Sequence, residues 1–166
     1  MFRIKVLVLI TLACLCCNGI KFPLQAGQVG NRMVTMDSDN NRVKLVCVNW
    51  YGAHMEDMVV NGLDRQNIQF IADKIAQLGF NCVRLPWALD TLFINPVVKE
   101  ERLTSNPELV GKTAMEIFDA TVTALTNAGL ITILNNHIST AQWCCPAEDG
   151  LWYTDEVSLG RKYLEI

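Results

Sequence analysis

The sequence predicts a parallel α/β fold, and two observations carry this prediction. Short apolar runs alternate with two helix-length segments in the order hairpin, strand, helix, strand, helix, strand. The apolar runs are continuous rather than alternating, which is typical of strands buried on both faces of a parallel sheet. Strands starting near residues 44, 81 and 130 leave room for a crossover helix and a long loop after each of the first two.

The composition indicates a globular protein and excludes some classes of partner. Of the 166 residues, 51% belong to the hydrophobic set AVILMFWYC, which is too many for a disordered chain. The 14 Lys and Arg against 17 Asp and Glu give a net charge of −3 without a basic cluster, so no nucleic acid is expected as a partner. The length allows one domain.

The first 19 residues are predicted to be a secretory signal peptide. Arg3 and Lys5 precede an apolar run over residues 6–17, and the small residue Gly19 follows it. Twelve residues are too few to cross a bilayer core, which takes about 20 in a helix. We therefore expect an exported, extracellular protein whose residues 20–166 form one continuous unit, with no membrane contact after cleavage. An uncleaved anchor or a core helix is the alternative.

Four of the seven cysteines lie beyond the predicted signal peptide. Cys47 and Cys82 stand in apolar, strand-like runs and are expected to be free buried thiols. Cys144 and Cys145 stand in a polar loop and are expected to form disulfides, whose partners the sequence leaves open. A zinc site at this pair is the alternative, but the spacing is CC rather than CxxC. No metal or cofactor is predicted.

The first predicted elements are a hairpin and a helix. Two apolar runs, 33–36 and 43–48, are separated by the turn-forming residues 37–41. A helix is predicted from Asp64, as N-cap, to Gly79, because Ile68, Ile71, Ala72, Ile75 and Leu78 recur at helical spacing.

The second half repeats a strand, a helix and a strand. Residues 80–86 form a short apolar run that ends at a proline and predicts a buried strand. Pro107 is expected to open a helix that ends at Gly129. Residues 130–134 predict the third strand, which Asn135-Asn136-His137 follows directly.

Polar groups are predicted at the carboxyl ends of the three strands, where parallel α/β folds place their chemistry. Asn49 and Trp50 end the first strand, Arg84 the second, and Asn136 with His137 the third. Alone, Arg84 reads as an ion-paired core residue and His137 as a hydrogen-bonded core histidine, but their coincidence favours a site. Two tryptophans of the third loop could stack on a sugar ring or pack within the loop, namely Trp143 and Trp152.

Four ordered stretches resemble a known family: KLVCVNWYGAH (44–54), LGFNCVRLPWA (78–88), GLITILNNHIS (129–139) and AQWCCPAEDGLWYTDE (141–156). They are similar to the first part of the catalytic domain of glycoside hydrolase family 5, in particular its endo-β-1,4-glucanases, the cellulases. The resemblance covers roughly residues 22–156. It implies a partial TIM (β/α)8 barrel, made of an N-terminal hairpin that covers the bottom and the first three parallel strands with their helices.

The resemblance also implies roles for individual residues. Arg84 would support the catalytic nucleophile, since a cation lowers the pKa of a neighbouring carboxylate, and His137 would contact sugar at the cleavage point. The other residues expected to bind a β-linked polysaccharide are Asn49, Trp50, His54, Asn136, Trp143 and Trp152. No cofactor and no protein partner are implied.

The catalytic glutamates of the resembled family are not expected in this chain. The family's retaining mechanism needs an acid/base and a nucleophile, which end the fourth and seventh strands. The Asn106-Pro107-Glu108 segment has the wrong order for the family motif and starts a helix. We therefore expect residues 20–166 to be a truncated part of a barrel that is inactive alone. The alternatives are a secreted, non-catalytic glycan-binding module and a small disulfide protein unrelated to sugars.

Overall fold

The computed structural model describes residues 20–143, and contacts divide the chain into two compact units at the junction of Lys44 and Leu45. The predicted signal peptide, Cys144, Cys145 and Trp152 lie outside the described residues. Within residues 20–143, no helix combines the length and the apolar character needed to span a bilayer.

The first unit is an antiparallel sheet of three strands, in the order β1 (Gln25–Val29), β2 (Arg32–Met36) and β3 (Arg42–Val43). The expected pairing across the turn at 37–41 is confirmed, because β2 and β3 pair in this register: Thr35 with Val43 and Met36 with Arg42. The strand β1 was not predicted, since its sequence QAGQV has no apolar pattern.

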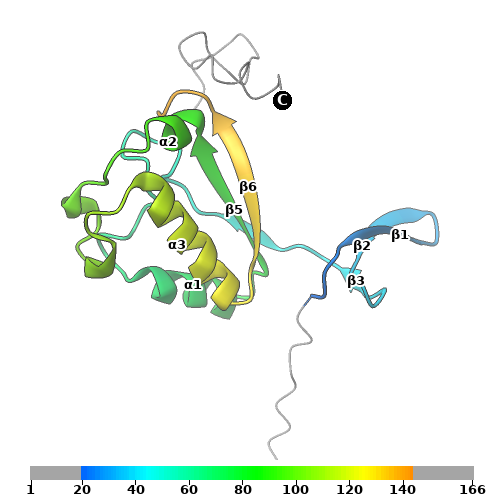
Figure 1. The fold of residues 1–166 in the computed structure, drawn as a ribbon. Helices are drawn as coiled ribbons and strands as arrows, with labels where there is room; N and C mark the ends of the chain where they lie inside the picture. Colours follow the sequence, from blue (N-terminus) through cyan, green and yellow to red (C-terminus); the bar gives the residue numbers. More distant parts are fainter. Residues whose placement is uncertain (1–19, 144–166) are drawn as a thin grey trace, which may run out of the picture. The chain divides into compact units, whose positions relative to one another are not determined.

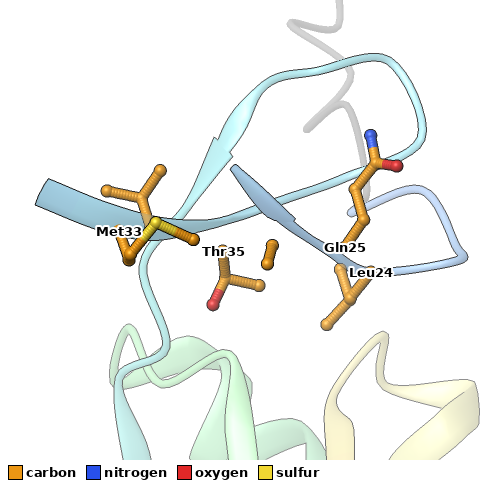
Figure 2. Close-up of a pocket in the computed structure, with 6 residues that line it drawn as sticks. Leu24, Gln25, Met33 and Thr35 are labelled. Carbon is orange, nitrogen blue, oxygen red and sulfur yellow. The ribbon is translucent and has the colours of Figure 1, made fainter. Parts of the chain in front are cut away.

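The turn of this unit is held by one carboxylate. Asp37 Oδ1 accepts hydrogen bonds from the backbone N–H groups of Asp39 (2.9 Å) and Asn41 (2.8 Å). One face of the hairpin carries an open hollow of about 390 Å³, which Figure 2 shows; it is lined by Leu24, Gln25, Ala26, Met33, Val34 and Thr35. None of these side chains titrates, so the hollow offers no acid or base.

The second unit is a parallel three-stranded sheet in the order β4 (Cys47–Asn49), β5 (Cys82–Ala88) and β6 (Ile131–Ile138). Between the strands lie α1 (Ile68–Gln77), α2 (Leu89–Phe93), α3 (Ala114–Asn127) and two 3-10 turns, η1 (Glu100–Arg102) and η2 (Pro107–Leu109). The helices α1 and α3 contact each other on one side of the sheet (Figure 1). The predicted parallel α/β architecture is therefore confirmed.

The strand boundaries differ from the predicted ones. The apolar run 43–48 is not one strand, because Val43 ends β3 while Cys47 begins β4 in the other unit. The strand β5 continues through Pro86 to Ala88, and β6 continues through His137 to Ile138. The strands run further than their apolar runs because residues beyond those runs still pair, Trp87 with Asn136 and Ala88 with Ile138.

The predicted helix ends are confirmed, and the predicted starts are wrong. Gly79 (φ 88°) and Gly129 (φ 76°) directly follow the C-caps of α1 and α3, where a left-handed residue closes a helix. The N-cap of α1 is Asn67 rather than Asp64, and Asn67 Oδ1 accepts from the N–H of Gln69 (2.9 Å). Pro107 opens only the 3-10 turn η2.

The helix α3 starts later than predicted because a better cap lies downstream. Thr113 Oγ1 accepts from the N–H of Glu116 (3.4 Å), and the Glu116 carboxylate accepts from the N–H of Thr113 (2.8 Å). This reciprocal capping box satisfies two N–H groups at the helix start. Gly111 (φ 82°), between η2 and this cap, interrupts any continuous helix from Pro107.

The core lies between the sheet and the two long helices. Val83 and Leu85 on β5 are fully buried, as are Leu125 on α3 and Leu63 in the loop before α1. Full burial of side chains of this kind contributes roughly 1.5–3 kcal/mol each.

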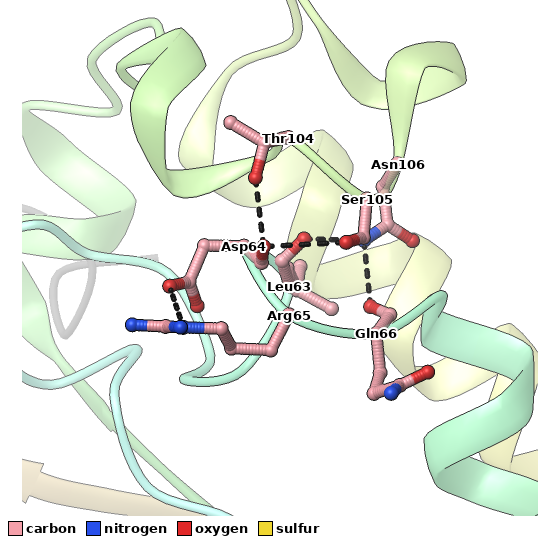
Figure 3. A network of polar contacts seen from close by, with 7 residues as sticks. All are labelled: Leu63, Asp64, Arg65, Gln66, Thr104, Ser105 and Asn106. Carbon is pink, nitrogen blue, oxygen red and sulfur yellow. Dashed lines mark hydrogen bonds and ion pairs between the residues drawn. The ribbon is translucent and has the colours of Figure 1, made fainter.

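A buried asparagine connects the loop before α1 to the loop before α3, as Figure 3 shows. Asn106 Nδ2 donates to the carbonyl oxygens of Leu63 (2.7 Å) and Gln66 (2.9 Å), and its Oδ1 accepts from the N–H of Ile68 (2.7 Å). The side chain is fully buried, so three backbone groups depend on it. Nearby, Asp64 does not cap the helix; its carbonyl accepts from the Thr104 hydroxyl (2.7 Å).

Cys47 and Cys82 form a disulfide, so the prediction of two free thiols was wrong. The two residues are register partners on adjacent strands, with their Cα atoms 4.3 Å apart. Parallel partners project their side chains from the same face of a sheet, which brings the two sulfurs together. Closing a loop of this length stabilises a protein by about 2–4 kcal/mol.

We expect Asn106→Ala to lower the free energy of unfolding by about 2–4 kcal/mol, because buried carbonyl and N–H groups lose their hydrogen-bond partner. Urea denaturation of the oxidised chain measures this change. The control is Asn127→Ala at the exposed end of α3, which should alter stability by less than about 0.5 kcal/mol. Equal effects of the two substitutions would remove Asn106 as the link between the loops.

Candidate functional site

Arg84 occupies the centre of the candidate site, and the strand register places its neighbours. Arg84 pairs with Asn49 on β4 and with Ile133 on β6. Side chains alternate between the two faces of a strand, so those at positions 133 and 135 share the face of Arg84. His137 lies at a register irregularity of β6, and its ring contacts Arg84 directly. The opposite face of β5 contributes Val83 and Leu85 to the core. Arg84 therefore lies within β5 rather than at its end, which corrects the predicted position.

The guanidinium of Arg84 contacts three neutral groups. Its Nη1 is 3.4 Å from Asn49 Oδ1, and its Nη2 is 2.6 Å from Asn135 Oδ1 and 3.3 Å from His137 Nδ1. Among residues 20–143, no carboxylate forms an ion pair with Arg84. Within the described part of the chain, the half-buried positive charge is thus held by amide and imidazole acceptors.

Asn135 joins this site, although sequence reasoning named Asn136. Asn135 and His137 both contact Arg84 Nη2, whereas Asn136 pairs with Trp87 on the opposite face. The buried Asn136 Oδ1 has no hydrogen-bond partner within the described part of the chain. The sequence holds no signal that selects Asn135, because the pairing of β6 is irregular at His137.

Tyr51 is a second residue that sequence reasoning missed. Its hydroxyl accepts a hydrogen bond from Asn49 Nδ2 (3.0 Å), and the Tyr51 side chain is 39% exposed. Gly52 allows this arrangement, because it has a φ of 126° and a Cβ there would lie 2.3 Å from the carbonyl oxygen of Val59. The tight approach positions the chain from Tyr51 to His54 beside the ends of the strands.

Trp50, which was predicted to bind sugar, is a core residue. Its side chain is buried among apolar residues, and its indole Nε1 donates to the carbonyl oxygen of Asn61 (2.8 Å). Trp50 directly follows Asn49, and successive side chains of an extended chain point to opposite faces of the sheet. The Trp50 side chain therefore points away from the face that carries Asn49. The prediction that Trp50 contacts ligand does not fit this placement.

An aromatic group surrounds the two histidines of the site. The rings of His54 and His137 meet edge to face at 4.9 Å between centroids, and Tyr51 and Trp143 lie 5.7 Å and 6.5 Å from His54. His54 is only 1% exposed, whereas Trp143 is 62% exposed. The site therefore combines the buried imidazole of His54 and the half-buried one of His137 with two aromatic faces that solvent reaches.

Hydrogen bonds tie together the three loops that follow the strands. The N–H of Gln142, after β6, donates to the carbonyl oxygen of His54, after β4 (3.0 Å). Asp90 Oδ2, after β5, accepts from the N–H of Ala141 (2.9 Å), and the Thr91 hydroxyl donates to the carbonyl oxygen of Ala53 (2.6 Å). These bonds hold Trp143 near Tyr51 at the same edge of the sheet.

Both histidines are held in the neutral form. Burial lowers the pKa of His54 below its ordinary value, and the nearby His137 and Arg84 lower it further. Burial and the charge of Arg84 lower the pKa of His137 in the same direction. At neutral pH, the positive charge of the described site residues is therefore that of Arg84, and the groups around it accept or donate hydrogen bonds.

Comparison with known proteins identifies the family. The sequence pattern of Cellulase (glycosyl hydrolase family 5) matches residues 36–158 of this chain. The chain belongs to glycosyl hydrolase family 5. A glycosyl hydrolase 5 family protein of Chamaecyparis obtusa is 36% identical over 135 residues, which cover 72% of this chain and 24% of that protein. The major extracellular endoglucanase of Xanthomonas campestris is 27% identical over 132 residues, covering 80% and 26%.

Solved structures of family 5 members agree with the partial barrel. The catalytic domain of the Xanthomonas campestris endoglucanase superposes with a TM-score of 0.66 at 26% identity, covering 80% of this chain and 37% of that domain. An endocellulase variant of Pyrococcus horikoshii, in complex with cellotetraose, gives a TM-score of 0.64 at 24% identity, covering 80% and 35%. The chain thus spans about a quarter of these curated relatives and about a third of these solved chains.

We expect the free energy of unfolding to fall as the pH drops below about 6.5, the ordinary histidine pKa. The unfolded chain binds protons there, while the folded chain keeps His54 and His137 neutral because their pKa values are lowered. The stabilisation is thus present above pH 6.5 and lost toward the folded pKa values, with a slope of up to about 1.4 kcal/mol per pH unit for each histidine.

Urea midpoints measured from about pH 7.5 to pH 5.5 test this dependence, since only histidines change charge widely in that range. The variant His54→Gln should reduce the slope, because it removes one of the two titrating groups. A slope that His54→Gln leaves unchanged would show that the acid sensitivity has another origin.

Proposed function

We propose that this protein is a glycosidase of the endoglucanase type that acts on a β-linked glucan such as cellulose. The observation that carries the proposal is the combination, on one edge of the sheet, of the Arg84 cluster with two solvent-accessible aromatic rings, Tyr51 and Trp143. Aromatic faces stack on sugar rings, and amides and imidazoles bind sugar hydroxyls. Membership of family 5 and the similarity to an endoglucanase support this choice of substrate.

Within this proposal the described residues bind and position the substrate. Tyr51 and Trp143 supply stacking surfaces, and Tyr51 replaces Trp50 in the predicted set. His137 donates a hydrogen bond to sugar near the cleavage point, and His54 supports its ring from the edge. Arg84 supplies the positive charge that would keep a carboxylate nucleophile ionised. The Asn49 amide links Arg84 to the Tyr51 hydroxyl.

We further propose that the 166-residue chain binds glucan without hydrolysing it. Retaining glycoside hydrolysis needs two carboxyl groups roughly 5 Å apart on either side of the bond. In residues 20–143 the groups within hydrogen-bonding reach of Arg84 are amides and an imidazole. The resemblance places the two glutamates on a fourth and a seventh strand, beyond the three strands described.

We expect cellotetraose to bind the oxidised chain saturably, and Trp143→Ala to weaken binding about tenfold. The loss of one stacked ring corresponds to roughly 1.4 kcal/mol. Isothermal titration calorimetry measures both dissociation constants. The matched control is Phe70→Ala, which removes an exposed ring on α1 and should leave binding unchanged. Absence of saturable binding to the folded chain would overturn the proposed glucan site.

The same samples test hydrolysis. We expect no release of reducing ends from soluble β-glucan by the 166-residue chain, at concentrations above the dissociation constant for cellotetraose. Release that Arg84→Ala abolishes would show instead that the chain contains a complete catalytic site.

We also propose that the protein is secreted. The apolar run at residues 6–17 supports this, as does the Cys47–Cys82 disulfide, because disulfides persist in oxidising compartments. Expression of the 166-residue sequence in a secreting eukaryotic host should yield protein in the medium, with an N-terminus within a few residues of Ile20. Intracellular protein that begins at Met1 would contradict this proposal.

A further inference from the structure

We propose that Asn135 is a positioning residue: it holds Arg84 against His137 Nδ1, so that His137 presents its Nε2–H group as a fixed hydrogen-bond donor. The ligand that would receive this bond rests on the proposed function. The positioning of Arg84 and His137 by Asn135 is a property of the chain without a bound ligand.

Among residues 20–143, the contact between Asn135 and Arg84 is the shortest that the guanidinium makes. Its 2.6 Å distance compares with 3.4 Å to Asn49 and 3.3 Å to His137. Hydrogen bonds with a charged donor are shorter and stronger than neutral ones. Asn135 therefore restrains the same nitrogen, Nη2, that faces the imidazole.

The orientation of the Asn135 amide is fixed from both ends. Its Oδ1 accepts from Arg84, while its Nδ2 donates to the backbone carbonyl oxygen of Asn136 (3.3 Å). Rotating the amide by 180° would turn its NH2 group toward the guanidinium, placing donor against donor. The strand backbone thus fixes the orientation in which the Asn135 amide presents its oxygen to Arg84.

The Arg84 contact determines where His137 carries its proton. An arginine side chain has donors only and stays protonated, so His137 Nδ1 at 3.3 Å must offer its lone pair. A neutral imidazole with an accepting Nδ1 carries its hydrogen on Nε2. The described residues provide no hydrogen-bond acceptor for this Nε2–H group. A ligand oxygen, such as a sugar hydroxyl or the oxygen of a glycosidic bond, has the complementary chemistry.

The chain allows a direct measurement, because His54 and His137 are its only two histidines. In a ¹⁵N-labelled chain carrying His54→Gln, long-range ¹H–¹⁵N NMR spectra report the protonation of each nitrogen of His137. Above the histidine pKa, we expect an unprotonated Nδ1 and a protonated Nε2. Adding Asn135→Ala should shift His137 toward a mixture of tautomers, because Arg84 is no longer held against Nδ1.

Two further variants complete the test. The control is Asn136→Ala, which shortens the neighbouring side chain on the opposite strand face and should leave the tautomer unchanged. Asn135→Asp preserves the shape and the acceptor, so it should keep the Nε2–H tautomer. It should also raise the pKa of His137, since the new carboxylate offsets the charge of Arg84.

Three results would overturn the positioning role: a protonated Nδ1 in the chain carrying only His54→Gln, an unaltered tautomer in folded Asn135→Ala, or an unaltered His137 pKa in Asn135→Asp. If circular dichroism shows that Asn135→Ala does not fold, Asn135→Asp decides the question. Cellotetraose binding is measured separately. If the chain fails to bind glucan while His137 shows the expected tautomer, only the proposed function is contradicted. If glucan binds while the tautomer results differ from those expected, only the positioning role is contradicted.

Discussion

The parallel register of β5 against its two neighbours is the constraint on which the second unit depends. It sets Asn49, Arg84 and Ile133 side by side across three strands. One face then carries the polar site, while the other carries Val83 and Leu85 into the core. A slip of one residue in either pairing would turn the site toward the helices and the core toward solvent.

Backbone hydrogen bonds between loops make this edge of the sheet a connected structure. The loops after β4 and β6 meet where Gln142 binds the carbonyl of His54, and the loops after β5 and β6 meet at Asp90. Side chains that come from three separate strands therefore depend on one another. The polar groups are placed by rigid strands, and the exposed rings by loops that are fastened to those strands.

The local features of the fold could be predicted from the sequence, whereas features that depend on distant partners could not. The glycines that end α1 and α3 and the parallel α/β order follow from local periodicity and turn chemistry. The start of α1 depends on Asn106, a contact across 38 residues, and the disulfide depends on which strand positions are opposite each other.

The candidate site shows the same division. Arg84, His137, His54 and Trp143 were predicted, and the structure brings them together, whereas Trp50 belongs to the core. Choosing Asn135 over Asn136 required knowing which side chains of β6 lie on the same face of the sheet as Arg84. The last pairings of β6 are shifted by an irregularity opposite Trp87 and Ala88. Local sequence alone does not fix such a shift.

The Cys47–Cys82 bond changes how the long connection from β4 to β5 is held. It makes residues 47–82 a covalently closed ring that contains Tyr51, His54 and the whole of α1. A single cut anywhere in the backbone of this ring would leave both pieces attached through sulfur. In an oxidising environment rich in proteases, β4 and β5 would thus remain covalently joined after a backbone cleavage between them. The same cleavage of a reduced chain would leave the two strands on separate polypeptides.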